Sequence, residues 1–150
     1  MADETTKTPT TSERRAAAEE ALRKADDAKA KRTEERELAI LELRAKYTAA
    51  GGTEGEDFAV YDAGAAGPIV LKLPATGRMV MLKRFRAPID DPKNGKITIE
   101  NSMQFVTPCV DYPAREVFLA ACEDRPAIAY ELANELHAML GKNEAAERGK

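Results

Sequence analysis

The sequence predicts an α+β fold that is mainly helical: a small antiparallel β-meander packed on a C-terminal helical bundle, with a long N-terminal helix. Three observations predict it. A stretch without Pro or Gly covers residues 12–50 and consists mostly of strong helix formers. Short apolar runs separated by turn residues occupy residues 58–85. Apolar residues then recur at helical spacing, between prolines, up to residue 141.

Composition excludes several classes of partner. The chain has 150 residues, with 23 basic residues against 26 acidic ones, so no overall charge attracts nucleic acid or an anionic membrane. No apolar run approaches the roughly 20 residues of a membrane span. Residues 1–11 lack the apolar segment of a secretory signal. We therefore expect a cytoplasmic protein with neither a nucleic-acid nor a membrane partner.

The N-terminal third predicts a tail followed by a solvated helix. Residues 1–11 are polar and Thr-rich, which is typical of a disordered tail. Residues 12–50 form the predicted helix, with Thr11 or Ser12 as its cap and Gly51-Gly52 as its end. Acid-then-base pairs four residues apart recur along it and support an isolated helix.

This predicted helix changes character near residue 38. Between residues 12 and 37 the only large apolar side chain is Leu22, so this half has no face to bury. Residues 38–47 carry an apolar stripe, which we expect to dock on a core or on a partner. A short coiled coil over the same residues is the alternative, since no sustained heptad pattern is present.

The β-meander is predicted inside a small domain over residues 57–141. Its strands are expected at Phe58–Tyr61, Ile69–Leu73 and Met79–Phe85, with turn-rich loops between them. In the third of these strands apolar residues lie on both faces. We expect one face to meet the helices and the other to remain free for a partner.

Three helices are predicted after the meander. Thr98 can cap the first, which carries Met103, Val106 and Val110, and Pro108 should kink or split it. Pro113 suits the first position of the second helix.

The last of these helices is expected to start at Pro126 and to end at Gly141. Its apolar residues form a clear stripe. Residues 142–150 are expected to be a disordered charged tail.

No motif predicts a catalytic, cofactor or metal site. The two cysteines, Cys109 and Cys122, lie in apolar helical surroundings, where a free cysteine usually acts as a small buried hydrophobe. His137 is the only histidine, and no nucleophile or carboxylate is spaced to orient it, so we expect a half-exposed surface residue. The basic run Lys83–Arg86 predicts a solvated strand end, with nucleic-acid contact as the alternative.

The region from Phe58 to Gly141 resembles phage tail assembly chaperones and their relatives in tail-like bacterial systems. The resemblance covers a little over half the chain. It rests on residues that are expected to start and end helices, and on short segments among them. These are Val106-Thr107-Pro108-Cys109-Val110, Tyr112-Pro113, the Glu116–Leu119 helix, Arg125-Pro126 and the closing Leu140-Gly141.

The resemblance implies a non-enzymatic protein that binds the long helical tape measure protein before the tail tube polymerises around it. Apolar helix faces would shield apolar stripes of the tape measure protein or of other tail components, and self-association is a further expectation. The alternative for these faces is that they form the domain's own core. The alternative function is a structural tail or baseplate adaptor retained in the finished particle. The candidate partner-binding residues are Leu38, Leu41, Tyr47, Met103, Val106, Val110, Leu132, Leu136 and Met139.

Overall fold

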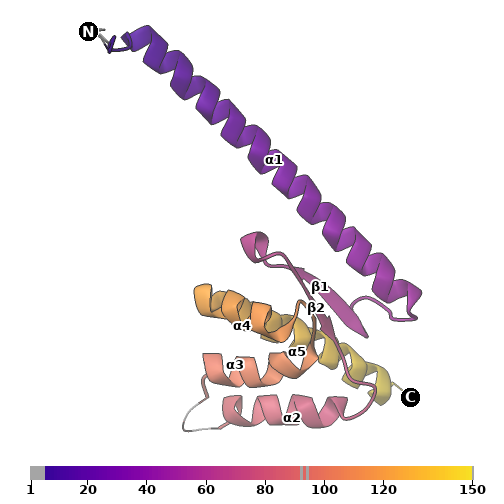
Figure 1. Ribbon diagram of the computed structural model, residues 1–150. Coiled ribbons are helices and arrows are strands. Elements are labelled where there is room, and N and C mark those ends of the chain that lie inside the picture. Colours follow the sequence, from indigo (N-terminus) through magenta and orange to yellow (C-terminus); the bar gives the residue numbers. More distant parts are fainter. Residues whose placement is uncertain (1–5, 92, 94, 150) are drawn as a thin grey trace. The chain divides into compact units, whose positions relative to one another are not determined.

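A computed structural model of the chain describes residues 6–91, 93 and 95–149 (Figure 1). The chain divides into two units, residues 1–38 and 39–150, which we describe separately. Helix α1, Thr11–Ala49, belongs in part to each. Of the predicted N-terminal tail, residues 6–10 form no regular secondary structure, and residues 1–5 lie outside the described residues.

In the first unit, α1 begins with a capping box. The Thr10 hydroxyl accepts a hydrogen bond from the Glu13 backbone amide at 3.2 Å, and the Thr10 amide donates to the Glu13 carboxylate at 2.8 Å. The cap is thus Thr10, which lies one residue before Thr11 and two before Ser12, the two predicted caps. The side chains of residues 11–32 are exposed, including Leu22 at 67%. The predicted solvated half, residues 12–37, is thus confirmed up to residue 32, whereas Thr33 and Arg36 are partly buried.

In the second unit, the last turns of α1 bury Tyr47. Its ring lies 5.4 Å from that of Phe58, and both pack with Val70 and the half-buried Leu43. Gly51 then adopts a φ of 97°, a left-handed conformation that suits glycine and ends the helix. The predicted stop at Gly51-Gly52 is confirmed.

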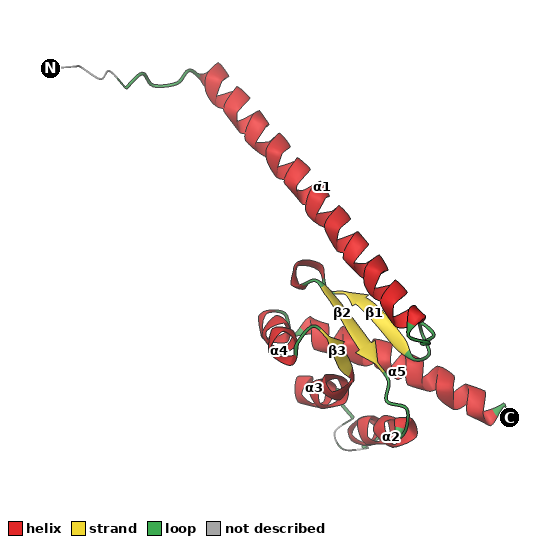
Figure 2. Cartoon of the chain, turned by 45° about the vertical axis from the view of Figure 1, so that its right-hand side comes forward, coloured by secondary structure: helices red, strands yellow, loops and turns green. Residues whose placement is uncertain are grey.

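Three strands among the described residues form one antiparallel sheet in the order β1-β2-β3: Phe58–Asp62, Pro68–Lys72 and Val110–Tyr112. Alternate residues face opposite sides. Ile69 and Leu71 join the main core with the helices, whereas Val70 joins the Tyr47 cluster. The sheet of the second unit is therefore covered on both faces (Figure 2).

The third predicted strand, Met79–Phe85, is wrong. This segment lies in helix α2, Arg78–Ile89, which buries Leu82 and Phe85 three residues apart. The periodicity of a short apolar run cannot by itself distinguish a strand from a helix. Methionine, leucine, lysine and arginine dominate this run, and all of them favour helix over strand.

The third strand is instead β3, which follows a helix that stops early. Helix α3, Ile99–Val106, is capped by the Thr98 hydroxyl, as predicted. Because Pro108 has no amide hydrogen, the helix gives way to the 3₁₀ turn Thr107–Cys109, and the predicted split is confirmed. Val110 consequently lies in the sheet and not on α3.

The last two helices differ from the prediction at their ends. Helix α4, Arg115–Asp124, starts two residues after Pro113, which was expected at its first position. Helix α5, Ala127–Arg148, begins one residue after Pro126, and it continues through Gly141, where it was expected to end. The predicted disordered tail is therefore helical up to Arg148.

Helix α5 is the centre of the main core. Its predicted stripe is buried, with Ile128, Leu132, Leu136 and Leu140 fully inaccessible. Helices α2 and α3 contact α5 and each other, and α4 contacts α5 (Figure 1). Among the described residues, no helix is both long and apolar enough to span a bilayer.

Candidate protein-binding groove

Most of the predicted partner-binding residues lie inside the domain. Val106, Leu132 and Leu136 have no exposed surface, and Met139 is 2% exposed. Their stripes meet one another in the main core, because a domain of this size needs them for its own burial. The prediction that these four residues contact a partner is therefore corrected: in this fold they offer no surface to one.

The other five predicted residues keep different amounts of surface. Tyr47 is 9% exposed, and Met103 and Val110 are half-buried against the core. Leu38, in the first unit, is 56% exposed, and Leu41, in the second, is 59% exposed. Only these two leucines remain freely accessible.

A groove opens between α2 and α3, and it was not predicted from the sequence. Its cavity has a volume of about 400 Å³. One wall comes from α2, and the other from α3 and the turn after it. The residues of both walls follow the spacing i, i+3, i+4, i+7, which is that of one helix face. The lining of this α2–α3 groove is Met81, Arg84, Phe85, Pro88, Asn101, Gln104, Phe105 and Pro108.

Two stacked phenylalanines make the floor of the groove. The rings of Phe85 and Phe105 lie 4.0 Å apart at 9°, and each residue is 6% exposed. Arg84 and Gln104 each precede one of these phenylalanines, and both are exposed. The α2–α3 groove thus has an aromatic floor between one cationic rim and one amide rim.

A second cavity continues the groove toward the start of α3. It has a similar volume of about 400 Å³ and shares Pro88 and Asn101 with the first. Asp91, Lys96 and Thr98 complete its lining. Because two lining residues are common to both, the cavities adjoin each other, and we refer to them together as the trough.

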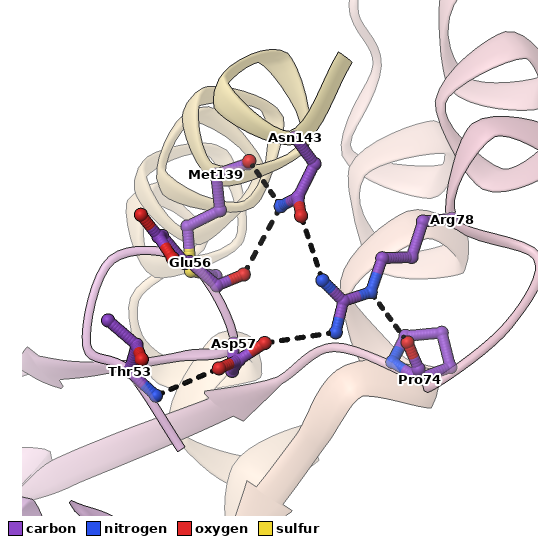
Figure 3. Close-up of polar contacts among 7 residues, drawn as sticks. All are labelled: Thr53, Glu56, Asp57, Pro74, Arg78, Met139 and Asn143. Atoms are coloured by element: carbon purple, nitrogen blue, oxygen red, sulfur yellow. Dashed lines mark hydrogen bonds and ion pairs between the residues drawn. The ribbon is translucent and has the colours of Figure 1, made fainter. Parts of the chain in front are cut away.

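The N-terminal end of α2 is fixed by Arg78, which lies among three polar groups (Figure 3). Its guanidinium donates to the Pro74 carbonyl at 2.7 Å, to Asn143 Oδ1 at 2.9 Å and to Asp57 Oδ1 at 3.2 Å. The Thr53 backbone amide and the Arg78 guanidinium hold the pKa of the Asp57 carboxyl below its usual value. The cluster joins α2, α5 and the loop before β1.

Asn143 explains why α5 passes Gly141. Its amide nitrogen donates to the Met139 carbonyl at 2.9 Å and to the Glu56 carbonyl at 3.2 Å, while its oxygen accepts from Arg78 (Figure 3). The bonds to Glu56 and Arg78, which are distant in sequence, hold this part of α5 in place.

The C-terminal half of α2 is fixed by Arg86. Its Nε donates to His137 Nε2 at 3.3 Å, and its Nη1 pairs with Glu144 at 3.3 Å. The His137 ring also lies 5.9 Å from that of Phe85, under the groove floor. The predicted partial exposure of His137 is confirmed, but the ring lies between α2 and α5 and contacts Arg86 and Phe85. Its partner Arg86 comes from a distant segment, which local spacing could not indicate.

The cysteines behave as the sequence predicted. Both are buried free thiols. Burial raises the pKa of the Cys109 thiol to about 11 and raises that of Cys122 as well, so both remain protonated near neutral pH. Among the described residues, no group of three or more His, Cys, Asp or Glu side chains is placed to hold a metal ion.

A buried phenol anchors the end of α1 to the sheet. The Tyr47 hydroxyl donates a hydrogen bond to the Asp111 carboxylate of β3. Burial, and then this bond and the charge of Asp111, raise the pKa of Tyr47 well above its usual value. The phenol therefore stays neutral and remains a donor.

Sequence reasoning missed the groove because it assigned the α2 segment to a strand. In a strand, Arg84 and Phe85 would point to opposite sides of the sheet. Such a strand would also give no reason to expect Met81 and Phe85 to pack against α3. The signal was nevertheless present: Met81, Phe85 and Ile89 recur every four residues, as on one helix face. No protein family, curated protein or solved structure matches this chain.

Proposed function

We propose that the chain is a non-enzymatic assembly chaperone of a phage or phage-like tail, which binds the tape measure protein in the cytoplasm before the tube polymerises. The observation that carries this proposal is the α2–α3 groove, an accessible aromatic-floored channel on the domain. The resemblance of residues 58–141 to such chaperones supplies the identity of the partner.

The groove has the properties of a helix-binding surface. Its volume of about 400 Å³ lies within the range of pockets that accept several apolar groups. Amphipathic helices bind other proteins by placing anchors at i, i+3, i+4 and i+7 in such grooves. Met81, half-buried on the α2 wall, has a flexible side chain that can adapt to different anchors. A tape measure protein presents many similar helical segments, so an adaptable groove suits it.

The test is an affinity purification of the tagged chain from cells during particle assembly, with mass spectrometry of the co-purifying proteins and of finished particles. We expect a long, helix-rich protein to co-purify and the chain to be absent from finished particles. Met81→Glu should abolish the capture, because a carboxylate would enter the apolar groove. Arg115→Ala, an exposed change on α4 outside the groove, should leave it intact.

Two results would overturn the proposal. One is capture of no tape-measure-like protein by the wild-type chain. The other is capture that survives Met81→Glu in a variant whose circular dichroism shows that it is folded.

A structural tail or baseplate adaptor is the second candidate, and the exposed helix of residues 11–38 favours it. This helix is solvated and has no apolar face of its own, as in a spacer or docking arm. An adaptor would be found at fixed stoichiometry in finished particles, whereas a chaperone would be lost from them. The same mass spectrometry therefore separates the two functions.

A further inference from the structure

We infer that the α2–α3 groove selects acidic amphipathic helices, in which a carboxylate lies one turn from the apolar residue that enters the groove. This inference rests on the proposed function and specifies the chemistry of the partner segment. It is carried by the charges of α2 and by the arrangement of the two groove walls.

Helix α2 has four basic residues and no acidic one. Arg78 pairs with Asp57 at 3.2 Å, and Arg86 pairs with Glu144 at 3.3 Å. Lys83 and Arg84 are exposed, and neither has an ion pair with any described residue. Two of the four charges are thus used within the domain, and two remain for another molecule.

Of these two free cations, only Arg84 lines the groove. It lies three residues after Met81 and four before Pro88, in the middle of the α2 wall. The opposite wall offers the neutral amides of Asn101 and Gln104, and no carboxylate among the described residues lines this cavity. The rim is therefore positive, without an internal charge to compensate it.

The continuation of the trough does not cancel this charge. Its lining adds one acid, Asp91, and one base, Lys96. Counted over the described residues, the trough lining therefore has one net positive charge, because Asp91 and Lys96 offset each other and Arg84 remains. An arginine fork binds carboxylates in bidentate geometry, and it does so more strongly next to a surface that excludes water.

The size of the walls sets the length of the bound segment. Helix α3 has eight residues, so at about 1.5 Å per residue the wall that it forms is about 12 Å long. This length matches about two turns of a bound helix. An apolar residue on the phenylalanine floor would then place a carboxylate three or four residues away beside Arg84. Nucleic acid is a poorer occupant, because binding a phosphate backbone needs a cluster of cations, and among the described residues the only cations that line the trough are Arg84 and Lys96.

The test uses two synthetic helical peptides of about 18 residues, long enough to hold a helix. Both carry leucines along one face. One has glutamate one turn from each leucine, and its twin has lysine there. Fluorescence anisotropy measures their binding to the full chain and to the Arg84→Glu variant. Arg115→Glu, a charge reversal on α4, is the matched control.

We expect the glutamate peptide to bind the wild-type chain about fivefold more tightly than the lysine peptide. High salt should reduce this preference. Arg84→Glu should reverse it, and Arg115→Glu should leave it unchanged. Met81→Glu should weaken both peptides.

Three results would overturn the inference. The wild-type chain could bind both peptides equally, or it could bind neither. Its preference for the glutamate peptide could also remain unchanged in the Arg84→Glu variant. Self-association of the chain that Arg84→Glu abolishes would assign the groove to a second copy and overturn it too. The proposed function fails separately: a chain that prefers the glutamate peptide but captures no tape measure protein would retain the groove chemistry and lose the tail-assembly function.

Discussion

Residues 11–38 and residues 39–150 both contain long helical segments, yet only the second group buries them. In the first group, the side chains of residues 11–32 are exposed, and the ion pairs Arg15–Glu19 and Glu20–Lys24 join neighbours four residues apart. In the second, α5 places its apolar stripe in the main core. The first helix is held by propensity and local pairs, whereas the second depends on tertiary packing.

This difference means that the two regions should respond differently to the same kind of substitution. Local helices lose stability in small steps, at the site of the change. A packed domain loses it cooperatively, because each core residue supports several elements. Substitutions in the packed domain should therefore cost much more stability than matched substitutions in the solvated helix.

Removal of a core aromatic side chain should produce the largest loss. Phe118 of α4 has no exposed surface, so Phe118→Ala should lower the free energy of unfolding by about 3–5 kcal/mol. Leu22→Ala removes an apolar side chain that is 67% exposed and should change it by less than about 0.5 kcal/mol. Urea unfolding measures both, with Phe118→Leu as a milder variant if the alanine protein does not fold. Similar losses for Phe118 and Leu22 would contradict the contrast.

Loss of the Arg78 cluster should come next. Arg78→Ala removes hydrogen bonds to three elements and should destabilise the domain by about 2 kcal/mol. The exposed Arg125–Glu131 pair, at 3.7 Å, supplies the control, and Arg125→Ala should cost no more than about 0.5 kcal/mol. Thermal unfolding followed by circular dichroism compares them. Equal effects would mean that the Arg78 bonds add nothing beyond a surface pair.

The same Arg78–Asp57 cluster should make the free energy of unfolding depend on pH in the acidic range. The pKa of Asp57 is lowered in the folded state from its ordinary value of 3.8, so its ionised form stabilises the fold above that pH. This contribution should disappear as the pH falls through the lower folded pKa. Asp57→Asn should therefore destabilise the protein at neutral pH, with the difference from wild type shrinking below about pH 4. Urea unfolding across this range measures it, and a constant difference would contradict the assignment.

The sequence predicted those parts of the fold that depend on local chemistry. The long helix, its end at Gly51-Gly52, strands β1 and β2 and the stripe of α5 all follow from spacing and turn residues. One part of the fold depended on contacts between distant segments. The α2 segment suits strand or helix by pattern, and its packing on α3 and α5 decides for helix.

The candidate site was hidden for the same reason. Apolar stripes show which residues are buried but not whether they face the core or a partner, and Leu132 and Leu136 proved to be core. The groove depends on the stacking of Phe85 on Phe105, two residues that lie twenty positions apart in the sequence. Gly141 predicts a helix end because glycine commonly ends helices, yet α5 continues past it, and the Asn143 amide bonds the following turn to the Glu56 carbonyl.

Gly141 therefore offers a stabilising substitution. It lies within α5, and a Cβ added there would meet no atom within 4 Å. Gly141→Ala should raise the free energy of unfolding by about 0.5–1 kcal/mol, because alanine loses less backbone freedom on folding. Gly52→Ala is the matched contrast, since its Cβ would lie 2.9 Å from the Phe58 ring and should destabilise. A neutral or negative effect at Gly141 would show that the helix is not continuous there in solution.

The smallest effect should come from the solvated helix. Glu20 pairs with Lys24 at 3.4 Å, one turn apart and largely exposed, so Glu20→Ala should weaken the helix locally by about 0.3 kcal/mol. Hydrogen exchange should become faster near residues 20–24, while the urea midpoint of the domain remains unchanged. If the midpoint shifted with Glu20, the helix of residues 11–38 would be coupled to the fold of residues 39–150. The contrast drawn above would then have to be abandoned, because local pairs would contribute to the cooperative unit.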